Sequence, residues 1–382
     1  MKRIGAILAV VIVIAAYVFF GVLPQRFDAK NNAVLPHEPY AVSEAARALH
    51  ETIPVADLHA DTLLWKRDPA KRQSRGQTDL VRLREGGVAL QVFTAVTKTP
   101  PAMNLDENAS DKDSLTLLMI AQAWPPRVWT SIYERAAYQA QRLAKLERDA
   151  PDDFVFVRTG SDLLRALNEG KLAGVYGIEG AHPLEGKLEN IDRLYDEGLR
   201  VMGLQHFFDN ELGGSLHGVS GGGLTEFGEA AVDRAVEKGM IIDVAHSSEA
   251  TARDVLARSS KPVIVSHTGL KGHCDTARNI SDGLMKDIAA HGGLVGAGFW
   301  QEAACATSPE GIAEQIVYAV NLLGADHVAL GSDFDGTVTT ALDASELAAL
   351  TQALMDAGLD DETIRAVMGE NAVRFFLENL PR

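Results

Sequence analysis

Two residues whose side chains could bind a metal stand close together near the start of the chain. His59 and Asp61 lie in the segment Asp57-Leu-His-Ala-Asp61. Because they are two positions apart, both side chains point to one face if the segment is an extended strand. A lone His-x-Asp pair is a weak motif, and strand-end histidines more often form hydrogen bonds than metal bonds. Its meaning therefore depends on partners elsewhere in the sequence.

Such partners follow other β-rich runs of the chain. Four of the eleven histidines stand at the ends of such runs, where a core strand would ordinarily offer Val or Ile. Acidic residues stand in equivalent places after the third and eighth runs. The histidines are His59, His206, His246 and His267, and the acidic residues are Glu179, Asp333 and Asp335.

A mixed set of imidazoles and carboxylates is suited to zinc. Five ligands exceed the three or four of one catalytic zinc, but they divide into two three-ligand sites if one carboxylate bridges. A two-metal site polarises a carbonyl group and lowers the pKa of a shared water. The predicted ligands are His59, Asp61, Glu179, His246 and His267.

The elements that must position these residues are eight short β-rich runs alternating with amphipathic segments. Strands alternating with helices predict parallel pairing, and eight such units in roughly 330 residues predict an α/β fold, the (β/α)8 TIM barrel. Such a barrel carries its chemistry at the carboxyl ends of its strands. An open doubly wound sheet is the alternative, but it should have a Gly-rich phosphate turn after its first strand. The runs are Val55–Leu58, Ala89–Val96, Gly174–Ile178, Val201–Gln205, Met240–Ala245, Pro262–Ser266, Leu294–Phe299 and Val328–Gly331.

Residues 97–159 form the largest interruption of this alternation. The sequence predicts a polar loop there, followed by a long helical stretch from Ser114 to Arg148.

The N-terminus predicts a membrane anchor. After Lys2 and Arg3, the run from Ile4 to Leu23 is uncharged, and its twenty residues would span roughly 30 Å as a helix. This run is longer than the roughly 7–15 apolar residues of a cleaved signal peptide, which favours an uncleaved signal-anchor. The positive end should stay cytoplasmic, which places the catalytic domain outside, in the periplasm if the source is bacterial. We therefore expect an anchor at 1–23, a linker at 24–42 and the (β/α)8 domain at 43–382.

The bulk composition excludes some partners and leaves one pairing open. The net charge of −16 argues against a nucleic-acid partner, because phosphate binding needs a basic face. With only two cysteines, Cys274 and Cys305, a zinc site made of cysteines alone is excluded. In an exported protein the two could form a disulfide, or they could be unrelated buried thiols.

In their order and spacing these segments resemble the membrane dipeptidase (renal dipeptidase) family, peptidase family M19, of the amidohydrolase superfamily. The resemblance covers the chain from about residue 50 to residue 380. It rests on Asp57-Leu-His-Ala-Asp61, Gln77-Thr-Asp-Leu-Val-Arg-Leu-Arg-Glu-Gly-Gly87, Gly177-Ile-Glu-Gly-Ala-His182, Gly223-Leu-Thr-Glu-Phe-Gly228, Gly239-Met-Ile-Ile-Asp-Val-Ala-His-Ser-Ser248, Val263-Ile-Val-Ser-His267, Arg278-Asn279 and Gly331-Ser-Asp-Phe-Asp-Gly336.

The resemblance implies a zinc-dependent dipeptidase with two Zn²⁺ per chain. It implies that His59 and Asp61 bind the first zinc, that His246 and His267 bind the second, and that Glu179 bridges them. A metal-bridged hydroxide would attack the peptide bond of a dipeptide. The family also suggests that a D-residue is accepted at the C-terminal position, and homodimers are common among relatives.

Three further roles are implied by the same matches. Asp333 would shuttle the proton, and His206 would hydrogen-bond the scissile carbonyl and its developing oxyanion. Arg278 would grip the carboxylate of the substrate, which its planar fork suits. Cys274 and Cys305 match a disulfide of mammalian members.

Other polar residues are assigned structural roles. Asp57 is expected to accept hydrogen bonds at the strand end, and Asp335 to shape the loop after Asp333. His217 and His273 are expected to face solvent. The mammalian family pattern has a hydroxyl residue before the fourth-strand histidine, where this chain has Gln205.

Two rival functions differ in what they require of the sequence. Another binuclear amidohydrolase, such as a lactonase or a deacetylase, commonly bridges its metals with a carboxylated lysine on strand four. This chain has Gln205-His206 there and Glu179 on strand three, which favours the dipeptidase. A catalytically inactive, membrane-tethered binding protein of the same fold is the other rival, and the intact ligand set with Asp333 and Arg278 argues against it.

Overall fold

A closed barrel of parallel strands forms the centre of the computed structural model, which describes residues 2–101, 104–109 and 112–382. The strands follow the order β2-β1-β9-β8-β7-β6-β5-β4, and a pairing of β2 with β4 closes the ring. The (β/α)8 fold is thereby confirmed, and the eight predicted runs all contribute to it. The strands are β1 (Val55–Ala60), β2 (Val88–Val96), β3 (Phe154–Val157), β4 (Leu172–Glu179), β5 (Leu199–Gly203), β6 (Ile241–Asp243), β7 (Ile264–Thr268), β8 (Leu294–Ala297) and β9 (Val328–Leu330).

The strand β3 was not predicted, because it is a run of only four residues inside the long interruption. It pairs with the first half of β4, from Leu172 to Val175, while β5 pairs with the second half, from Tyr176 onward. β3 therefore extends the sheet at the amino end of β4 and leaves the ring of eight intact.

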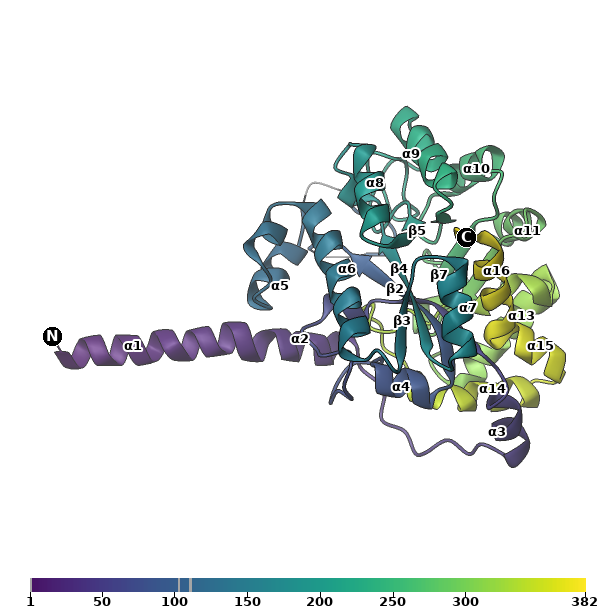
Figure 1. Ribbon diagram of the computed structural model, residues 1–382, viewed down its shortest axis with the longest axis horizontal. Helices are drawn as coiled ribbons and strands as arrows, with labels where there is room; N and C mark the ends of the chain where they lie inside the picture. The colour runs from purple at the N-terminus through teal and green to yellow at the C-terminus, as the bar shows by residue number, and fades with distance from the viewer. Residues whose placement is uncertain (1, 102–103, 110–111) are drawn as a thin grey trace.

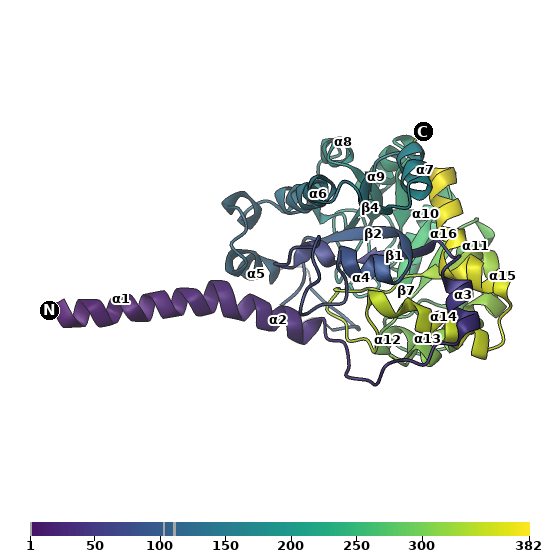
Figure 2. The same ribbon diagram turned by 60° about the horizontal axis from the view of Figure 1, so that its bottom comes forward.

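Helices surround this barrel, as Figures 1 and 2 show from two directions. Many of them begin at a Ser or Thr whose hydroxyl accepts a backbone N–H of the first turn, as Ser248 does from Thr251 and Ser281 does from Leu284. The helices of the domain are α3 (Glu44–His50), α4 (Leu80–Glu85), α5 (Leu115–Ala121), α6 (Ile132–Asp149), α7 (Gly160–Asn168), α8 (Glu189–Asp196), α9 (Glu226–Glu237), α10 (Glu249–Arg258), α11 (Asp282–Ala290), α12 (Gln301–Ala304), α13 (Pro309–Leu323), α14 (Leu347–Asp356), α15 (Asp361–Arg365) and α16 (Asn371–Asn379).

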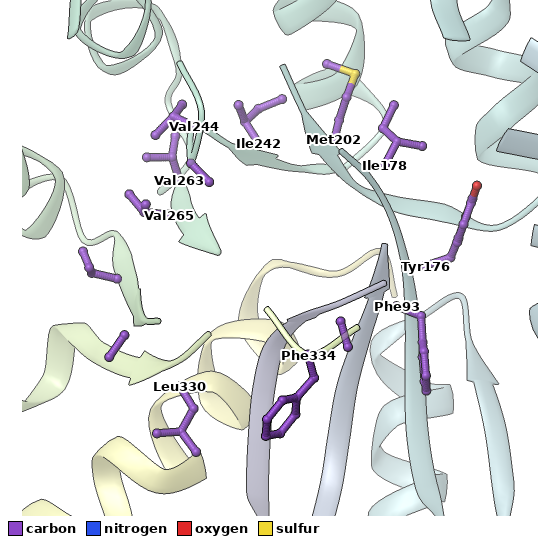
Figure 3. Packing of buried hydrophobic residues seen from close by; sticks show 14 of the residues in the cluster. Phe93, Tyr176, Ile178, Met202, Ile242, Val244, Val263, Val265, Leu330 and Phe334 are labelled. Atoms are coloured by element: carbon purple, nitrogen blue, oxygen red, sulfur yellow. The ribbon is translucent and has the colours of Figure 1, made fainter. Parts of the chain in front are cut away.

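Two apolar clusters hold the barrel. The larger one lies between the strands and the helices, and Figure 3 shows part of it, with Tyr176 and Ile178 of β4 beside Met202 of β5. The smaller cluster has members from all eight barrel strands together with Phe376 of α16. A cluster that every strand enters is the interior of the barrel, so α16 closes its amino-terminal end.

The predicted helical stretch from Ser114 to Arg148 is broken in the structure. α5 ends at Ala121, a short 3-10 turn covers Pro126–Trp129, and α6 begins at Ile132. The adjacent prolines Pro125 and Pro126 explain the break, because proline cannot donate the backbone hydrogen bond of a helix interior.

The N-terminal segment is one long helix that projects from the barrel (Figure 1). It comprises α1 (Lys2–Tyr17), a π turn (Val18–Val22) and α2 (Leu23–Asn31), and its stretch from Arg3 to Asn31 is long and apolar enough to cross a membrane. The expected linker therefore differs in its first part, which is helical. Pro24 lies inside this continuous helix, directly after the π turn, where its missing N–H interrupts the regular hydrogen-bond ladder.

Candidate metal centre

The strand-end carboxylate of Glu179 lies at the middle of the predicted ligands. Its Oε1 is 3.1 Å from His246 Nε2, 3.3 Å from His267 Nε2 and 3.6 Å from His59 Nε2. Its Oε2 is 3.3 Å from His206 Nε2. Four different strand ends therefore meet around one carboxylate, and all these side chains are buried.

Neighbouring hydroxyl groups turn the imidazoles toward this centre. The Ser266 hydroxyl lies 3.1 Å from His59 Nδ1 and 2.9 Å from His267 Nδ1, which leaves the Nε2 atoms of both rings facing inward. The Thr94 hydroxyl donates to Asp61 Oδ1 over 2.6 Å, and that oxygen is 3.6 Å from His59 Nε2. Ser266 and Thr94 were missed from the sequence, where an isolated hydroxyl residue on a strand carries no signal.

Burial favours the neutral form of two of the imidazoles. It lowers the pKa of His246 and of His267 well below the usual value, and the nearby Arg278 adds to the shift for His246. Burial also opposes a charge on His59, but Glu179, Asp61 and Asp333 together raise the pKa of His59 to about 10. The centre thus combines lone pairs on nitrogen with an excess of negative charge.

The carboxylates repel one another in this buried place. Burial and the adjacent Asp61 raise the pKa of Glu179 well above its usual range. Burial raises the pKa of Asp333 to about 8, although His59 opposes the shift. Three acidic side chains here face one guanidinium, that of Arg278, so added positive charge would stabilise their ionised forms.

The nitrogen and oxygen atoms that could bind a metal here suit divalent cations. His246 Nε2 and His267 Nε2 are 3.0 Å apart, near the roughly 3.3 Å that separates two ligands about 2.05 Å from one tetrahedral zinc. Three groups of three residues have potential ligand atoms within 4.8 Å of one another; two of the groups share His59, and two share Glu179. They are His59, His267 and Asp333; His59, Asp61 and Glu179; and Glu179, His206 and His246.

His206 can act in two ways, depending on which of its ring nitrogens carries a proton. Its Nδ1 lies 3.3 Å from the carbonyl oxygen of Lys98, and its Nε2 faces Glu179 Oε2. If Nδ1 donates to that carbonyl, a neutral ring presents a lone pair at Nε2; a protonated ring presents a donor there. Burial lowers the pKa of His206 to about 3, which favours the neutral ring in the protein alone.

Asp333 and Asp335 follow β9 and have different contacts. Asp333 adopts a left-handed backbone (φ 59°), and its Oδ1 lies 3.8 Å from His59 Nε2. Asp335 accepts hydrogen bonds from the Gln77 backbone N–H and the Thr78 hydroxyl, as expected of a residue that shapes the loop. Gly336 follows Asp335, and a Cβ at this position would overlap the Asp333 carboxylate as it is placed.

Asp57 also has a structural place. Its carboxylate accepts hydrogen bonds from the Ser332 backbone N–H, the Ser332 hydroxyl and the Gln91 amide. These contacts tie β1 to the residues after β9.

Arg278 is buried beside the imidazoles. Its Nη2 donates to the His267 carbonyl oxygen over 2.8 Å, and its guanidinium carbon lies 5.3 Å from the centre of the Trp300 ring. The loop after β7, which carries Arg278, also contains Cys274, and this cysteine forms a disulfide with Cys305, the pairing that the family resemblance implies.

His217 corrects one expectation from the sequence. It was expected to face solvent, but it is fully buried, with Nδ1 2.6 Å from the Leu105 carbonyl oxygen and its ring 5.5 Å from that of His246. The reason is that the Gly-rich loop folds back on itself: Gly214 lies so close to Gly222 that a Cβ would overlap its carbonyl. His273 is half-buried, with Nε2 3.3 Å from the Ala304 carbonyl oxygen.

A cavity of about 990 Å³ begins at this centre. Its inner wall includes Asp61, Glu179, His206, His246, Arg278 and Asp333. The arrangement can therefore hold a small polar molecule against the cluster of histidines and carboxylates.

Comparisons with known proteins agree with this geometry. The family described as membrane dipeptidase (peptidase family M19) matches residues 43–379. Dipeptidase ataJ of Aspergillus terreus is 27% identical over 328 residues, which are 78% of this chain and 76% of that protein.

Two solved structures share the fold. A metallopeptidase from Rhodobacter sphaeroides, liganded with a phosphinate mimic of the dipeptide L-Ala-D-Ala, is 26% identical with a TM-score of 0.72, covering 86% of this chain and 99% of that one. The probable dipeptidase PvdM from Pseudomonas aeruginosa has a TM-score of 0.74 at 22% identity, covering 88% and 98%, and supports the fold alone.

Proposed function

The chain belongs to the membrane dipeptidase family, peptidase family M19, and is a metallo-dipeptidase; from this premise we propose that it hydrolyses dipeptides with two zinc ions. His59 and Asp61 would hold one ion, and His246 and His267 the other. Glu179 would bridge them. The single observation that carries the proposal is the place of Glu179, whose Oε1 lies within 3.6 Å of three imidazole nitrogens from different strands.

The metal ions, when bound, would supply Lewis-acid activation of a water and of the scissile carbonyl. The chain's own groups would do the rest. Asp333 lies close enough to the centre to accept a proton from the attacking water and return it to the leaving amine. His206 Nε2 lies beside Glu179 Oε2, and the neutral ring with its proton at Nε2 would donate to the carbonyl oxygen as negative charge develops.

Arg278 would fix the substrate by its carboxylate. The guanidinium lines the cavity and is buried, so a carboxylate reaching it would form charge-assisted hydrogen bonds away from water. An anchor at one end and a reactive centre at the other would measure the length of the peptide and favour two residues.

We also propose that a D-residue is accepted at the C-terminal position. This is supported by the Rhodobacter sphaeroides relative, which is liganded with a mimic of L-Ala-D-Ala and is 26% identical to this chain. The N-terminal helix would anchor the enzyme in a membrane at residues 1–23, with the catalytic domain outside the cytoplasm.

Metal analysis combined with a screen of L-Xaa-L-Xaa and L-Xaa-D-Xaa dipeptides tests the proposal. We expect about two zinc ions per chain and hydrolysis of dipeptides, with L-Ala-D-Ala among those cleaved. Zinc-loaded protein that cleaves no dipeptide would contradict the proposed function, whereas cleavage of L,L-dipeptides alone would contradict only the D-residue.

A further inference from the structure

The N-terminal helix forms one wall of the active-site cavity. The cavity that contains Glu179 and His246 is also lined by Phe19, Leu23 and Phe27. These residues precede position 43, where the match to the family begins. The family's catalytic machinery therefore does not account for them.

The helix is fixed to the catalytic end of the barrel by a buried ion-pair chain. Asp28 of α2 is 1% exposed, and its carboxylate lies 3.1 Å from Arg67 Nε and 2.8 Å from Arg75 Nε. Arg67 in turn pairs with Asp335 over 2.8 Å, two residues after Asp333. A buried carboxylate without these partners would be costly, so the contacts hold the helix in one place beside the catalytic loop.

The same part of the helix would lie at a membrane surface. The uncharged run ends at Leu23, and the exposed cations Arg26 and Lys30 follow within two turns, as expected at a layer of lipid headgroups. α5 lies beside this part of the helix in both views (Figures 1 and 2), and its Leu117 is 63% exposed. An exposed leucine at the level of the apolar run fits a face that touches the bilayer.

The outer part of the cavity is mostly apolar and larger than a small dipeptide requires. Leu117 and Leu118 of α5 and Trp65 line it together with Phe19 and Leu23, and the charged Arg26, Lys30 and Glu302 also border the cavity. Its volume of about 990 Å³ lies at the upper end of the roughly 300–1,000 Å³ that drug-sized ligands occupy. A dipeptide of two small residues held at the metal centre would leave this apolar compartment unfilled.

We propose that the N-terminal helix and α5 form an apolar subsite at the membrane surface, and that the enzyme prefers dipeptides carrying a long alkyl chain that lies in the bilayer. The inference rests on the proposed dipeptidase function. Dipeptide chemistry takes place at the metal centre, and the alkyl chain extends between Phe19 and Leu117 toward the lipid. Burial of each added methylene group stabilises the bound substrate.

The test uses the full-length, zinc-loaded enzyme in phosphatidylcholine nanodiscs with two substrates. One is Ala-Ala, and the other is its analogue in which the N-terminal methyl side chain is extended to octyl. We expect kcat/KM to be at least about tenfold higher for the octyl analogue, and Phe19→Ala to reduce this ratio by roughly threefold to tenfold.

Phe20→Ala is the matched control. Phe20 is adjacent, of the same type and 42% exposed, and within the described residues it is not part of the cavity wall. Because all variants share one bilayer, partitioning of the octyl analogue into lipid affects them equally, and Phe20→Ala should keep the wild-type ratio. Equal ratios for Phe19→Ala and Phe20→Ala, no preference for octyl, or an intact mass that lacks residues 1–31 would overturn the inference. Failure to cleave either substrate would instead overturn the dipeptidase function itself.

Discussion

The two ends of the barrel are built from the same strands but differ in almost every physical property. At the amino-terminal end the interior is apolar, with Val175, Val201 and Ile264 packed against Phe376 of α16. At the carboxyl end the same strands lead into Glu179, His206 and His267. One end excludes water and charge, whereas the other gathers ionisable groups that repel one another.

This difference shows how the fold separates stability from chemistry. Each fully buried apolar side chain contributes about 1.5–3 kcal/mol, so the closed end can offset the cost of grouping carboxylates at the open end. The separation is along the strand, within a few residues: Val175 belongs to the core and Glu179 to the centre. Substitutions at the two ends should therefore change different measurements.

The largest effect is expected from Asp333→Asn. Loss of the group that transfers the proton should lower kcat about 10³-fold or more, within the roughly 10²–10⁴ of general acid–base catalysis. Zinc content should stay near two per chain, because Asp333 is proposed not to be a primary ligand. Steady-state kinetics and metal analysis of the same preparation check both outcomes.

Asp335→Asn provides the comparison for that variant. The Asp335 carboxylate pairs with Arg67 and accepts a hydrogen bond from the Thr78 hydroxyl. The loss of its charge should therefore lower the melting temperature and change kcat only slightly. If Asp333→Asn kept its turnover while Asp335→Asn lost it, the two roles would have been assigned the wrong way round.

At the closed end, Phe376→Ala should cost about 3–5 kcal/mol of unfolding free energy, as expected for a large buried aromatic side chain. The kcat of the molecules that remain folded should be unchanged. Leu377→Ala on the same helix is the control, because Leu377 is 37% exposed and its loss should cost little. Denaturant unfolding measures the stabilities, and a large fall in kcat for Phe376→Ala would contradict the separation of the two ends.

Arg278→Ala should have the smallest effect. The loss of charge-assisted hydrogen bonds, about 1.5–3 kcal/mol, should raise KM roughly tenfold to a hundredfold for dipeptides with a free carboxylate. Amidated dipeptides lack that carboxylate and should be little affected. An equal rise in KM for both kinds of substrate would rule out the anchoring role.

The closed barrel could be predicted from the sequence because its signals are local and repeated. Each of the eight runs is rich in apolar residues, and at the ends of six of them a His, Glu or Asp marks the edge of the core. Helix caps are local in the same way, as at Ser43, whose hydroxyl accepts from the Ala46 backbone N–H three residues on. The strand β3 lacked such a signal, since a run of four apolar residues has no period of its own.

The supporting residues of the site depend on contacts between distant segments and left no local pattern. Ser266 lies between two imidazoles only because β1 and β7 approach each other across the barrel. His217 is buried because a Gly-rich loop folds back, and glycine-rich composition alone suggests exposure. The docking of α2 depends on Asp28 meeting Arg67 and Arg75, which are about forty residues away in the sequence.

Glu179 is proposed to bridge two metal ions, and the zinc content per chain of Glu179→Gln tests this role most directly. Gln keeps the size of the side chain but removes the negative charge that two cations would share. We predict about two zinc ions in the wild-type chain and one or fewer in Glu179→Gln, with dipeptide hydrolysis lost. Two zinc ions and wild-type turnover in Glu179→Gln would contradict the account.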